Sequence, residues 1–155
     1  MSHHNILIVD DFEAMRQIIR RFLGMFGLRN VDEAEDGTAA LAKLAEKKFT
    51  LVIADWKMAP MDGIELLRRM RAESRYKEIP FLMVTSATEP SSVTTARAAG
   101  VNGYIAKPFS AAMLKEKIEA ICGPLPRAGA PAHDARPIPP TPIPPKPGRI
   151  ARPVA

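Results

Sequence analysis

Apolar positions along the first 123 residues recur in two alternating patterns. Continuous apolar runs, of which Ile6 to Val9 is the first, are typical of strands buried on both faces of a parallel sheet. Between the runs, apolar residues three and four positions apart predict amphipathic helices. The predicted strands are 6–9, 28–34, 50–55, 81–84 and 103–106, and the predicted helices are 12–26, 38–47, 63–74, 89–99 and the segment after Ser110.

The alternation of strand and helix patterns indicates the fold class. Successive strand–helix–strand units form right-handed crossovers, which place parallel strands in one sheet and helices on both of its faces. We therefore predict an α/β fold with three layers, in which a five-stranded parallel sheet lies between two layers of helices. Residues 1–123 form the predicted domain, because they are enough to bury a useful core.

The same spacing predicts which side chains the helices bury and where the helices end. Gly27 and Gly100 are placed to end helices, and Ser110 is placed to cap one. The residues predicted to share an inward face are Phe12, Met15, Ile18, Ile19, Phe22, Leu23 and Phe26 in the first helix, Leu41, Leu44 and Ala45 in the second, Ile64, Leu67, Met70 and Arg71 in the third, and Met113, Leu114, Ile118 and Ile121 in the last.

The formal net charge of +5 suggests nucleic-acid binding, but the distribution of the charge argues against it. Residues 124–155 carry five arginines and lysines against Asp134 alone, a net of +4, so the first 123 residues keep only +1. A nearly neutral domain lacks the basic surface that binds DNA. No apolar run reaches membrane-spanning length and no signal-peptide pattern occurs, so we expect no membrane association and a cytoplasmic location.

Residues 124–155 form a tail whose composition differs from that of the domain. They hold 11 of the 15 prolines and the near-repeat Pro-Ile-Pro-Pro at 137–140 and 142–145. This composition predicts a disordered segment that samples the polyproline II conformation and forms no packed core. The tail is a docking ligand, a basic arm for an acidic partner or an extension without a specific role.

Polar residues directly follow four of the apolar strand runs. They are the pair Asp10 and Asp11, then Asp55, Thr85 and Lys107. The carboxyl ends of parallel strands share one edge of the sheet, where ligands bind in open α/β folds. Three carboxylates, a hydroxyl and an ammonium gathered there suit the binding of a divalent cation and the acceptance of a phosphoryl group.

These residues belong to short motifs that occur in order over residues 4–122. The motifs are Asp10-Asp11, Asp55-Trp56, Met61-Asp62-Gly63, Val84-Thr85-Ser86, Gly103-Tyr104 and Lys107-Pro108-Phe109. In content, order and spacing they resemble the receiver domain of two-component response regulators, in particular the single-domain, CheY-like chemotaxis regulators. The resemblance implies a flavodoxin-like sheet with strand order 2-1-3-4-5.

The resemblance also implies a phosphoryl acceptor and a metal site. Asp55 would accept a phosphoryl group from a sensor histidine kinase or a phosphotransfer protein, and a bound Mg²⁺ would keep the clustered carboxylates ionised. The residues that would hold Mg²⁺ are Asp11 and Asp55 directly, Asp10 through a water molecule, and Lys57 through its main-chain carbonyl.

The remaining motif residues would contact the phosphoryl group or respond to it. Lys107, followed by a cis peptide bond to Pro108, would supply fixed positive charge, and Thr85 would donate its hydroxyl to a phosphoryl oxygen. When Thr85 moves, Tyr104 would turn inward and change a surface that binds a protein target. That output surface comprises the fourth helix, the fifth strand and the fifth helix, including Arg97, Tyr104 and Lys117.

Three positions depart from the family pattern. Pro60 stands one position later than usual, which changes the path of the loop that carries Lys57. Lys57 and Ala87 flank the phosphoryl site, where the lysine would shield the phosphorus and the alanine cannot orient a water. We therefore predict a longer-lived phosphoryl group than asparagine and glutamate at these positions would give.

The residues favour a signalling protein over an enzyme, apart from catalysis of its own phosphorylation and dephosphorylation. A phosphatase of the haloacid dehalogenase type needs a second aspartate two residues after the nucleophile, and here Phe12 and Lys57 occupy those positions. No helix-turn-helix pattern follows the domain, so we expect output through protein contact. The alternatives to a phosphorylated messenger are a phosphorelay intermediate, a phosphate sink and a scaffold that works without phosphorylation.

Overall fold

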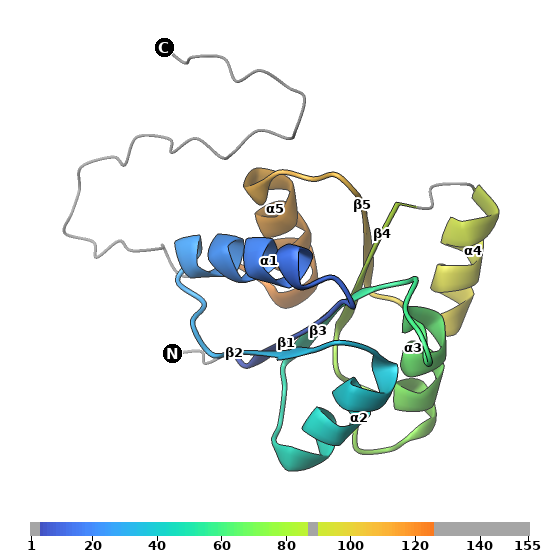
Figure 1. The fold of residues 1–155 in the computed structure, drawn as a ribbon. Coiled ribbons are helices and arrows are strands. Elements are labelled where there is room, and N and C mark those ends of the chain that lie inside the picture. Colours follow the sequence, from blue (N-terminus) through green and yellow to red (C-terminus); the bar gives the residue numbers. More distant parts are fainter. Residues whose placement is uncertain (1–3, 87–89, 126–155) are drawn as a thin grey trace, which may run out of the picture.

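The computed structural model describes residues 4–86 and 90–125, and within them it contains every predicted strand and helix in the predicted order (Figure 1). The strands are β1 (Ile6–Val9), β2 (Val31–Ala34), β3 (Leu51–Asp55), β4 (Phe81–Thr85) and β5 (Gly103–Ala106). The helices are α1 (Glu13–Met25), α2 (Gly37–Glu46), α3 (Gly63–Ala72), α4 (Pro90–Ala99) and α5 (Ala111–Cys122).

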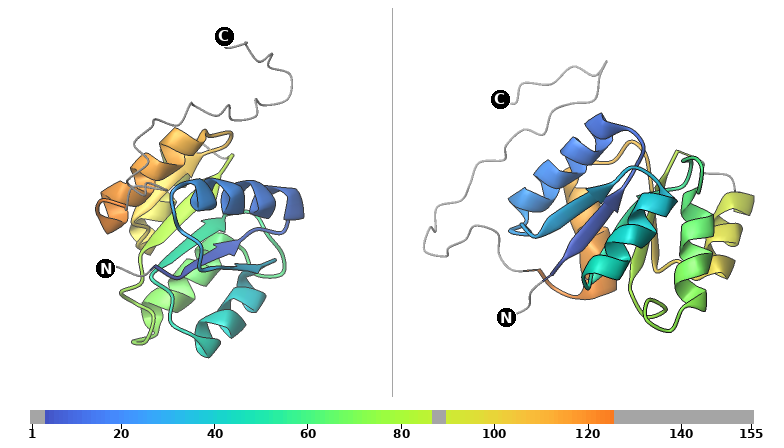
Figure 2. Two further views of the ribbon diagram at one scale, coloured as in Figure 1. Left: turned by 90° about the vertical axis from the view of Figure 1, so that its left-hand side faces the viewer. Right: turned by 60° about the horizontal axis from the view of Figure 1, so that its bottom comes forward.

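The five strands form one parallel sheet in the order β2-β1-β3-β4-β5. Figure 2 shows α1 and α5 on one face of the sheet and α2, α3 and α4 on the other. The three central strands β1, β3 and β4 are buried along their whole length, which explains their continuous apolar runs. The α/β class, the three layers and the flavodoxin-like strand order are therefore confirmed.

Alternate residues of the central strands feed two separate cores. Leu7 and Val52 point into the core beneath α2, α3 and α4, whereas Ile8 and Ile53 point into the core beneath α1 and α5. This division follows from the two-residue repeat of a strand, which directs successive side chains to opposite faces.

Local signals set the helix ends, and Ser110, Gly27 and Gly100 do so as predicted. The side chains of Asp36, Asp62 and Ser110 accept hydrogen bonds from main-chain amides at the starts of α2, α3 and α5, at 2.9, 2.9 and 3.1 Å. Gly27 and Gly100 follow α1 and α4 with φ of 86° and 103°, a conformation that favours glycine.

Some predicted boundaries and inward residues are wrong. The second strand begins at Val31, not at residue 28, because Leu28 N still bonds to Leu23 O at 2.9 Å in the turn that closes α1. Phe12 precedes α1 in an extended conformation and is 62% exposed. The predicted apolar arcs are wider than the buried ones, so other predicted inward residues are also exposed: Ile18, Ala45 and Met113.

Arg71 lies on the inward side of α3, but it forms hydrogen bonds with main-chain carbonyls that a hydrophobic residue would leave without partners. Its guanidinium donates to Ile79 O at 2.8 Å, to Gly100 O at 3.0 and 3.1 Å, and to Asn102 Oδ1 at 2.8 Å. Asn102 Oδ1 also accepts from Phe81 N at 2.8 Å. Arg71 therefore joins α3 to the loops that precede β4 and β5.

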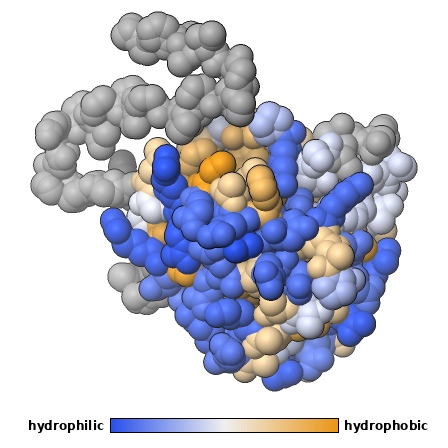
Figure 3. All heavy atoms as spheres, in the orientation of Figure 1, coloured by the Kyte–Doolittle hydropathy of each residue, from blue (hydrophilic) through white to orange (hydrophobic). Residues whose placement is uncertain are grey.

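On the face shown in Figure 3, hydrophilic side chains predominate and apolar areas are smaller. Among the described residues, no helix combines the length and the apolar character needed to cross a membrane. The predicted boundary at residue 123 and the proline-rich tail stay predictions, because residues 126–155 lie outside the described part of the chain.

Candidate functional site

The ends of four strands bring the predicted site residues together. Asp55 and Thr85 are the last residues of β3 and β4, while Asp10 and Lys107 directly follow β1 and β5. Carboxylate oxygens of Asp10, Asp11 and Asp55 all lie within 4.8 Å of one another. Lys107 Nζ lies 3.3 Å from Asp55 Oδ1 and 3.5 Å from Asp10 Oδ2. The predicted convergence at the carboxyl edge of the sheet is present.

Asp10 is buried with one oxygen incompletely satisfied. Its Oδ1 accepts a hydrogen bond from Phe12 N at 2.8 Å, but its enclosed Oδ2 has only the Lys107 ammonium beside it, at 3.5 Å, and receives no hydrogen bond within the described structure. Burial raises the pKa of Asp10 above its ordinary value, against the opposing effects of the Phe12 amide and the Lys107 ammonium. A buried carboxylate oxygen without a hydrogen-bond partner is costly, and a bound cation would remove that cost.

Asp55 has a similar environment, with 8% of its surface exposed. Burial raises the pKa of Asp55, Lys107 opposes this shift, and the neighbouring charge of Asp10 adds to it. Asp11, the third carboxylate, is exposed. Two buried acids and one exposed acid form an oxygen-only donor set, which fits a hard divalent cation such as Mg²⁺.

Lys107 is positioned by the residues that follow it. The Lys107–Pro108 peptide bond is cis, as predicted. The Phe109 ring packs edge-on against Phe22 of α1, with ring centres 6.2 Å apart. On the other side, Lys107 N donates to Thr85 O at 2.9 Å, so the lysine is tied to the end of β4. Thr85 itself is buried, with 1% of its surface exposed.

The loop after β3 is held close to the proposed acceptor. Gly63 N donates to Trp56 O at 2.8 Å, and a Cβ at residue 63 would collide with the main-chain oxygen of Asp55. Only glycine therefore lets α3 begin at this place. The later position of Pro60 coincides with a second cis bond, between Ala59 and Pro60.

The remaining predicted residues have defined places but untested roles. Lys57 is exposed in the loop after β3, and the role of its carbonyl stays a prediction. Tyr104 is half-buried on β5 and packs against the core beneath α2, α3 and α4. Arg97 on α4 and Lys117 on α5 are exposed, as an output surface requires. Ala87 lies outside the described residues.

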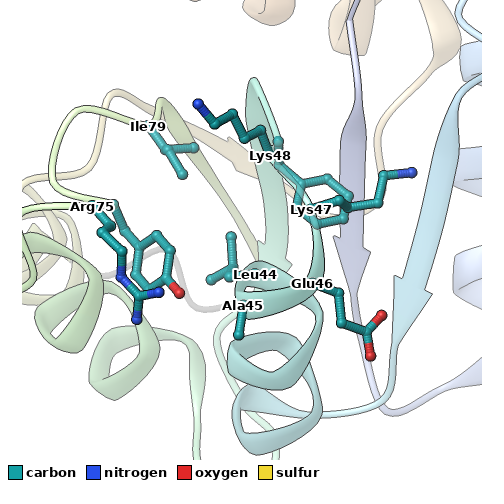
Figure 4. A pocket seen from close by; sticks show the side chains of 9 residues that line it. Leu44, Ala45, Glu46, Lys47, Lys48, Arg75 and Ile79 are labelled. Atoms are coloured by element: carbon teal, nitrogen blue, oxygen red, sulfur yellow. The ribbon is translucent and has the colours of Figure 1, made fainter.

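A pocket lies at the opposite edge of the sheet. Its volume is about 560 Å³, and it is lined by the end of α2 and by the segment after α3, including Leu44, Phe49, Tyr76 and Ile79. Figure 4 shows Leu44 and Ala45 on its wall, between Lys48 on one side and Arg75 on the other. Because the carboxylates lie at the other ends of the strands, this pocket forms no part of their site.

The arrangement of acids and lysine can be compared with known protein families. The family model described as the response regulator receiver domain matches residues 6–119. The chain belongs to the response regulator receiver family. The receiver match covers all ten strands and helices of the described structure except the last residues of α5.

Relatives of this receiver chain include chemotaxis proteins. The chemotaxis protein CheY of Pseudomonas aeruginosa is 51% identical over 116 residues, which cover 75% of this chain and 94% of that protein. CheY-3 of Vibrio cholerae is 47% identical over 116 residues, covering 75% of this chain and 89% of that protein.

Solved structures give the same family. Vibrio cholerae CheY4 superposes with a TM-score of 0.73 at 33% identity, over 77% of this chain and 99% of that chain. The receiver domain of a Pseudomonas aeruginosa sensor histidine kinase, solved with magnesium in its active-site cleft, gives 0.72 at 25% identity, over 79% and 100%. Receiver domains bind Mg²⁺ at an acidic cluster of the kind that Asp10, Asp11 and Asp55 form here.

Sequence patterns missed Arg16, and they placed Arg71 on the inward face of the third helix without predicting its hydrogen bonds. Arg16 donates to Asp10 O, and Arg71 donates to the loops at the other edge of the sheet. Arg71 gave a usable signal, since it is a charged residue on an otherwise apolar helix face. Arg16 gave none, because its partner is a main-chain carbonyl that any residue carries.

Proposed function

We propose that this chain is a single-domain response regulator that accepts a phosphoryl group on Asp55 from a sensor histidine kinase or a phosphotransfer protein. The observation that carries the proposal is the position of Asp55 between the acidic cluster and Lys107, whose Nζ lies 3.3 Å from Asp55 Oδ1. The receiver family supplies the class of function, and it is a signalling class rather than that of a classical enzyme.

The residues divide the chemistry among them. An oxygen of Asp55 would attack the phosphorus, forming an aspartyl phosphate as the bond from phosphorus to the donor breaks. Lys107 would neutralise a phosphoryl oxygen from its side of the site, and the Thr85 hydroxyl would donate to another. Asp10 and Asp11 would bind Mg²⁺ with Asp55 and the Lys57 carbonyl. The bound cation would supply positive charge to the transferred group.

The signal would leave through the face formed by α4, β5 and α5. Tyr104 lies on β5 beside Met83 of β4, and Thr85 ends the same strand, so a shift of Thr85 can reach Tyr104 through two neighbouring strands. Exposed Arg97 and Lys117 flank this face and would contact a protein target in the cytoplasm. The similarity to chemotaxis proteins supports a chemotaxis pathway over a phosphorelay intermediate or a phosphate sink.

The test is phosphorylation of the full chain by acetyl phosphate with and without Mg²⁺, followed by intact mass spectrometry. We expect a mass gain of one phosphoryl group that requires Mg²⁺ and disappears in Asp55→Asn. Asp32→Asn is a matched control, because Asp32 is an acid of β2 that pairs with Lys43 and Lys47 outside the carboxylate cluster. A mass unchanged under all conditions would instead make the chain a scaffold that works without phosphorylation.

A further inference from the structure

A network of charged side chains lies beside the carboxylate cluster, between α1 and β2. Arg16 Nε donates to Glu33 Oε1 at 2.8 Å, and Arg16 Nη1 donates to the main-chain oxygen of Asp10 at 2.6 Å. Arg20, one turn later, donates to the other oxygen of Glu33 at 2.7 Å and to Val31 O at 3.1 Å. Both arginines bind Glu33, but Arg16 alone is shown to reach the loop that carries the acids.

The bond from Arg16 acts on the orientation of Asp11. The oxygen of Asp10 belongs to the peptide plane that joins Asp10 to Asp11, so fixing that oxygen fixes the plane. The rest of Asp10 is held separately: its amide donates to Ala34 O at 3.1 Å, and its side chain accepts from the Phe12 amide. Asp11 is exposed, so the direction of its carboxylate depends on the backbone that Arg16 holds.

Burial supports a fixed role for Arg16. Its side chain is 16% exposed and that of Glu33 is 21% exposed, whereas the side chain of Arg20 is 43% exposed. Glu33 holds Nε, which leaves the guanidinium plane aimed at the Asp10 carbonyl. A planar fork with two partners loses less freedom per hydrogen bond than a single flexible ammonium would.

We propose that Arg16 is a positioning residue for the cation site: it holds the Asp10–Asp11 peptide plane so that the Asp11 carboxylate points at the cation. This inference rests on the proposed Mg²⁺ site. It concerns the affinity for the cation, on which Arg16 would act only through the backbone oxygen of Asp10.

Charge and geometry predict opposite results when Arg16 is removed, which makes the inference testable. A positive group near the site repels Mg²⁺, so its removal on charge grounds alone would tighten binding. Loss of the hydrogen bond to Asp10 would release the peptide plane and weaken binding. The sign of the change in affinity therefore separates the two effects.

The experiment is a Mg²⁺ titration of the full chain, read by the fluorescence of Trp56 and by calorimetry, for Arg16→Met, Arg16→Lys and Arg20→Met. We expect Arg16→Met to bind Mg²⁺ about tenfold more weakly, in line with the loss of other outer partners of metal ligands. Arg20→Met is the matched control: it removes an arginine paired with Glu33 but leaves the bond to Asp10, and we expect a change of less than about twofold.

Arg16→Lys keeps the charge and loses the fork, so it isolates geometry, and we expect binding weaker than that of the wild type. If Arg16→Met does not unfold cooperatively in denaturant, and so is not properly folded, the Mg²⁺ affinity of Arg16→Lys tests the inference in its place. Unchanged or tighter binding in Arg16→Lys would overturn the inference, as would weakening of equal size in Arg20→Met. If the wild type itself binds no Mg²⁺ and gains no phosphoryl group, the proposed function fails; if it binds normally and only these variants disagree, this inference alone fails.

Discussion

Charged side chains at the two edges of the sheet have opposite surroundings. At the carboxyl edge, Asp10 and Asp55 are buried acids whose pKa values are raised by that burial, and Asp10 Oδ2 has no hydrogen-bond partner within the described structure. At the opposite edge, the guanidinium of Arg71 donates to main-chain carbonyls of two loops, and Asn102 accepts another of its bonds. At the carboxyl edge, the Asp10 oxygen remains available to bind a cation. At the opposite edge, the hydrogen bonds of Arg71 stabilise the fold.

The largest expected effect is a loss of stability when the hydrogen bonds of Arg71 are removed. Arg71→Met would leave the carbonyls of Ile79 and Gly100 without their donor, at a cost of about 3 kcal/mol in the free energy of unfolding. Arg75→Met is the control, because Arg75 is exposed and its ion pair is with Glu73, so we expect a change within about 0.5 kcal/mol. Denaturant unfolding of both variants measures the difference. Equal stabilities would show that Arg71 does not hold the loops.

The next largest effect is expected from a substitution that adds a methyl group at the carboxyl edge. Gly63→Ala would push a methyl group against the main-chain oxygen of Asp55, so we expect a loss of about 2 kcal/mol in stability and weaker Mg²⁺ binding. Gly24→Ala is the matched glycine control, because it lies inside α1 with open space around it, and alanine there should stabilise by about 0.5–1 kcal/mol. Thermal unfolding with and without Mg²⁺ checks both. A Gly63→Ala protein as stable as the wild type would contradict the collision.

A smaller effect removes the unfavourable charge at the carboxyl edge. Asp10→Asn should raise stability in metal-free buffer by about 1–2 kcal/mol, because it deletes a buried negative charge while Lys107 keeps its ion pair with Asp55. Burial raises the pKa of Asp10 in the folded protein above its ordinary value of 3.8. The wild type therefore has its full stability below pH 3.8, and its free energy of unfolding falls as the pH rises through the folded pKa.

The gap between wild type and Asp10→Asn should therefore widen as the pH rises from below 3.8 toward neutrality, and saturating Mg²⁺ should narrow it. Unfolding curves across that range, with and without the cation, measure the gap. A gap that is independent of pH would mean that Asp10 does not titrate in a buried site.

The smallest expected effect concerns the lifetime of the phosphoryl group. Replacing Lys57 with asparagine and Ala87 with glutamate together should speed dephosphorylation by roughly fivefold, or about 1 kcal/mol of barrier, because a polar pair would admit and orient a water. Loss of phosphorylated protein after the phosphodonor is removed gives the rate. An unchanged rate would mean that these two positions do not control attack by water.

Patterns that repeat along the chain were sufficient to predict the α/β class and the three layers, whereas the strand order was predicted from the resemblance to receiver domains. Buried strands such as Leu51–Asp55 read as continuous apolar runs, and the site residues followed because parallel strands end at one edge. Exposed Phe12 and Ile18 were assigned to the buried face because helical spacing includes every apolar residue of an arc, whether or not a partner covers it.

Contacts with the backbone left little trace in the sequence. Arg71 donates mainly to main-chain carbonyls, and Arg16 donates to one main-chain carbonyl besides its bond to Glu33. Every residue carries such a carbonyl, so no pattern of side chains marks these partners. The collision that reserves residue 63 for glycine likewise depends on how closely α3 approaches the end of β3. Such features depend on distances between elements far apart in sequence, which periodicity does not contain.

The bond between Lys107 N and Thr85 O has a consequence for exchange with solvent. It extends the pairing of β4 and β5 one step beyond Ala106, so the amide of Lys107 is locked as a strand amide although the residue belongs to a loop. Its proton should exchange with deuterium at the slow rate of the sheet interior. The exchange rate of that one proton therefore measures how often β4 and β5 separate at this end, and a change that parts the two strands would appear there as faster exchange.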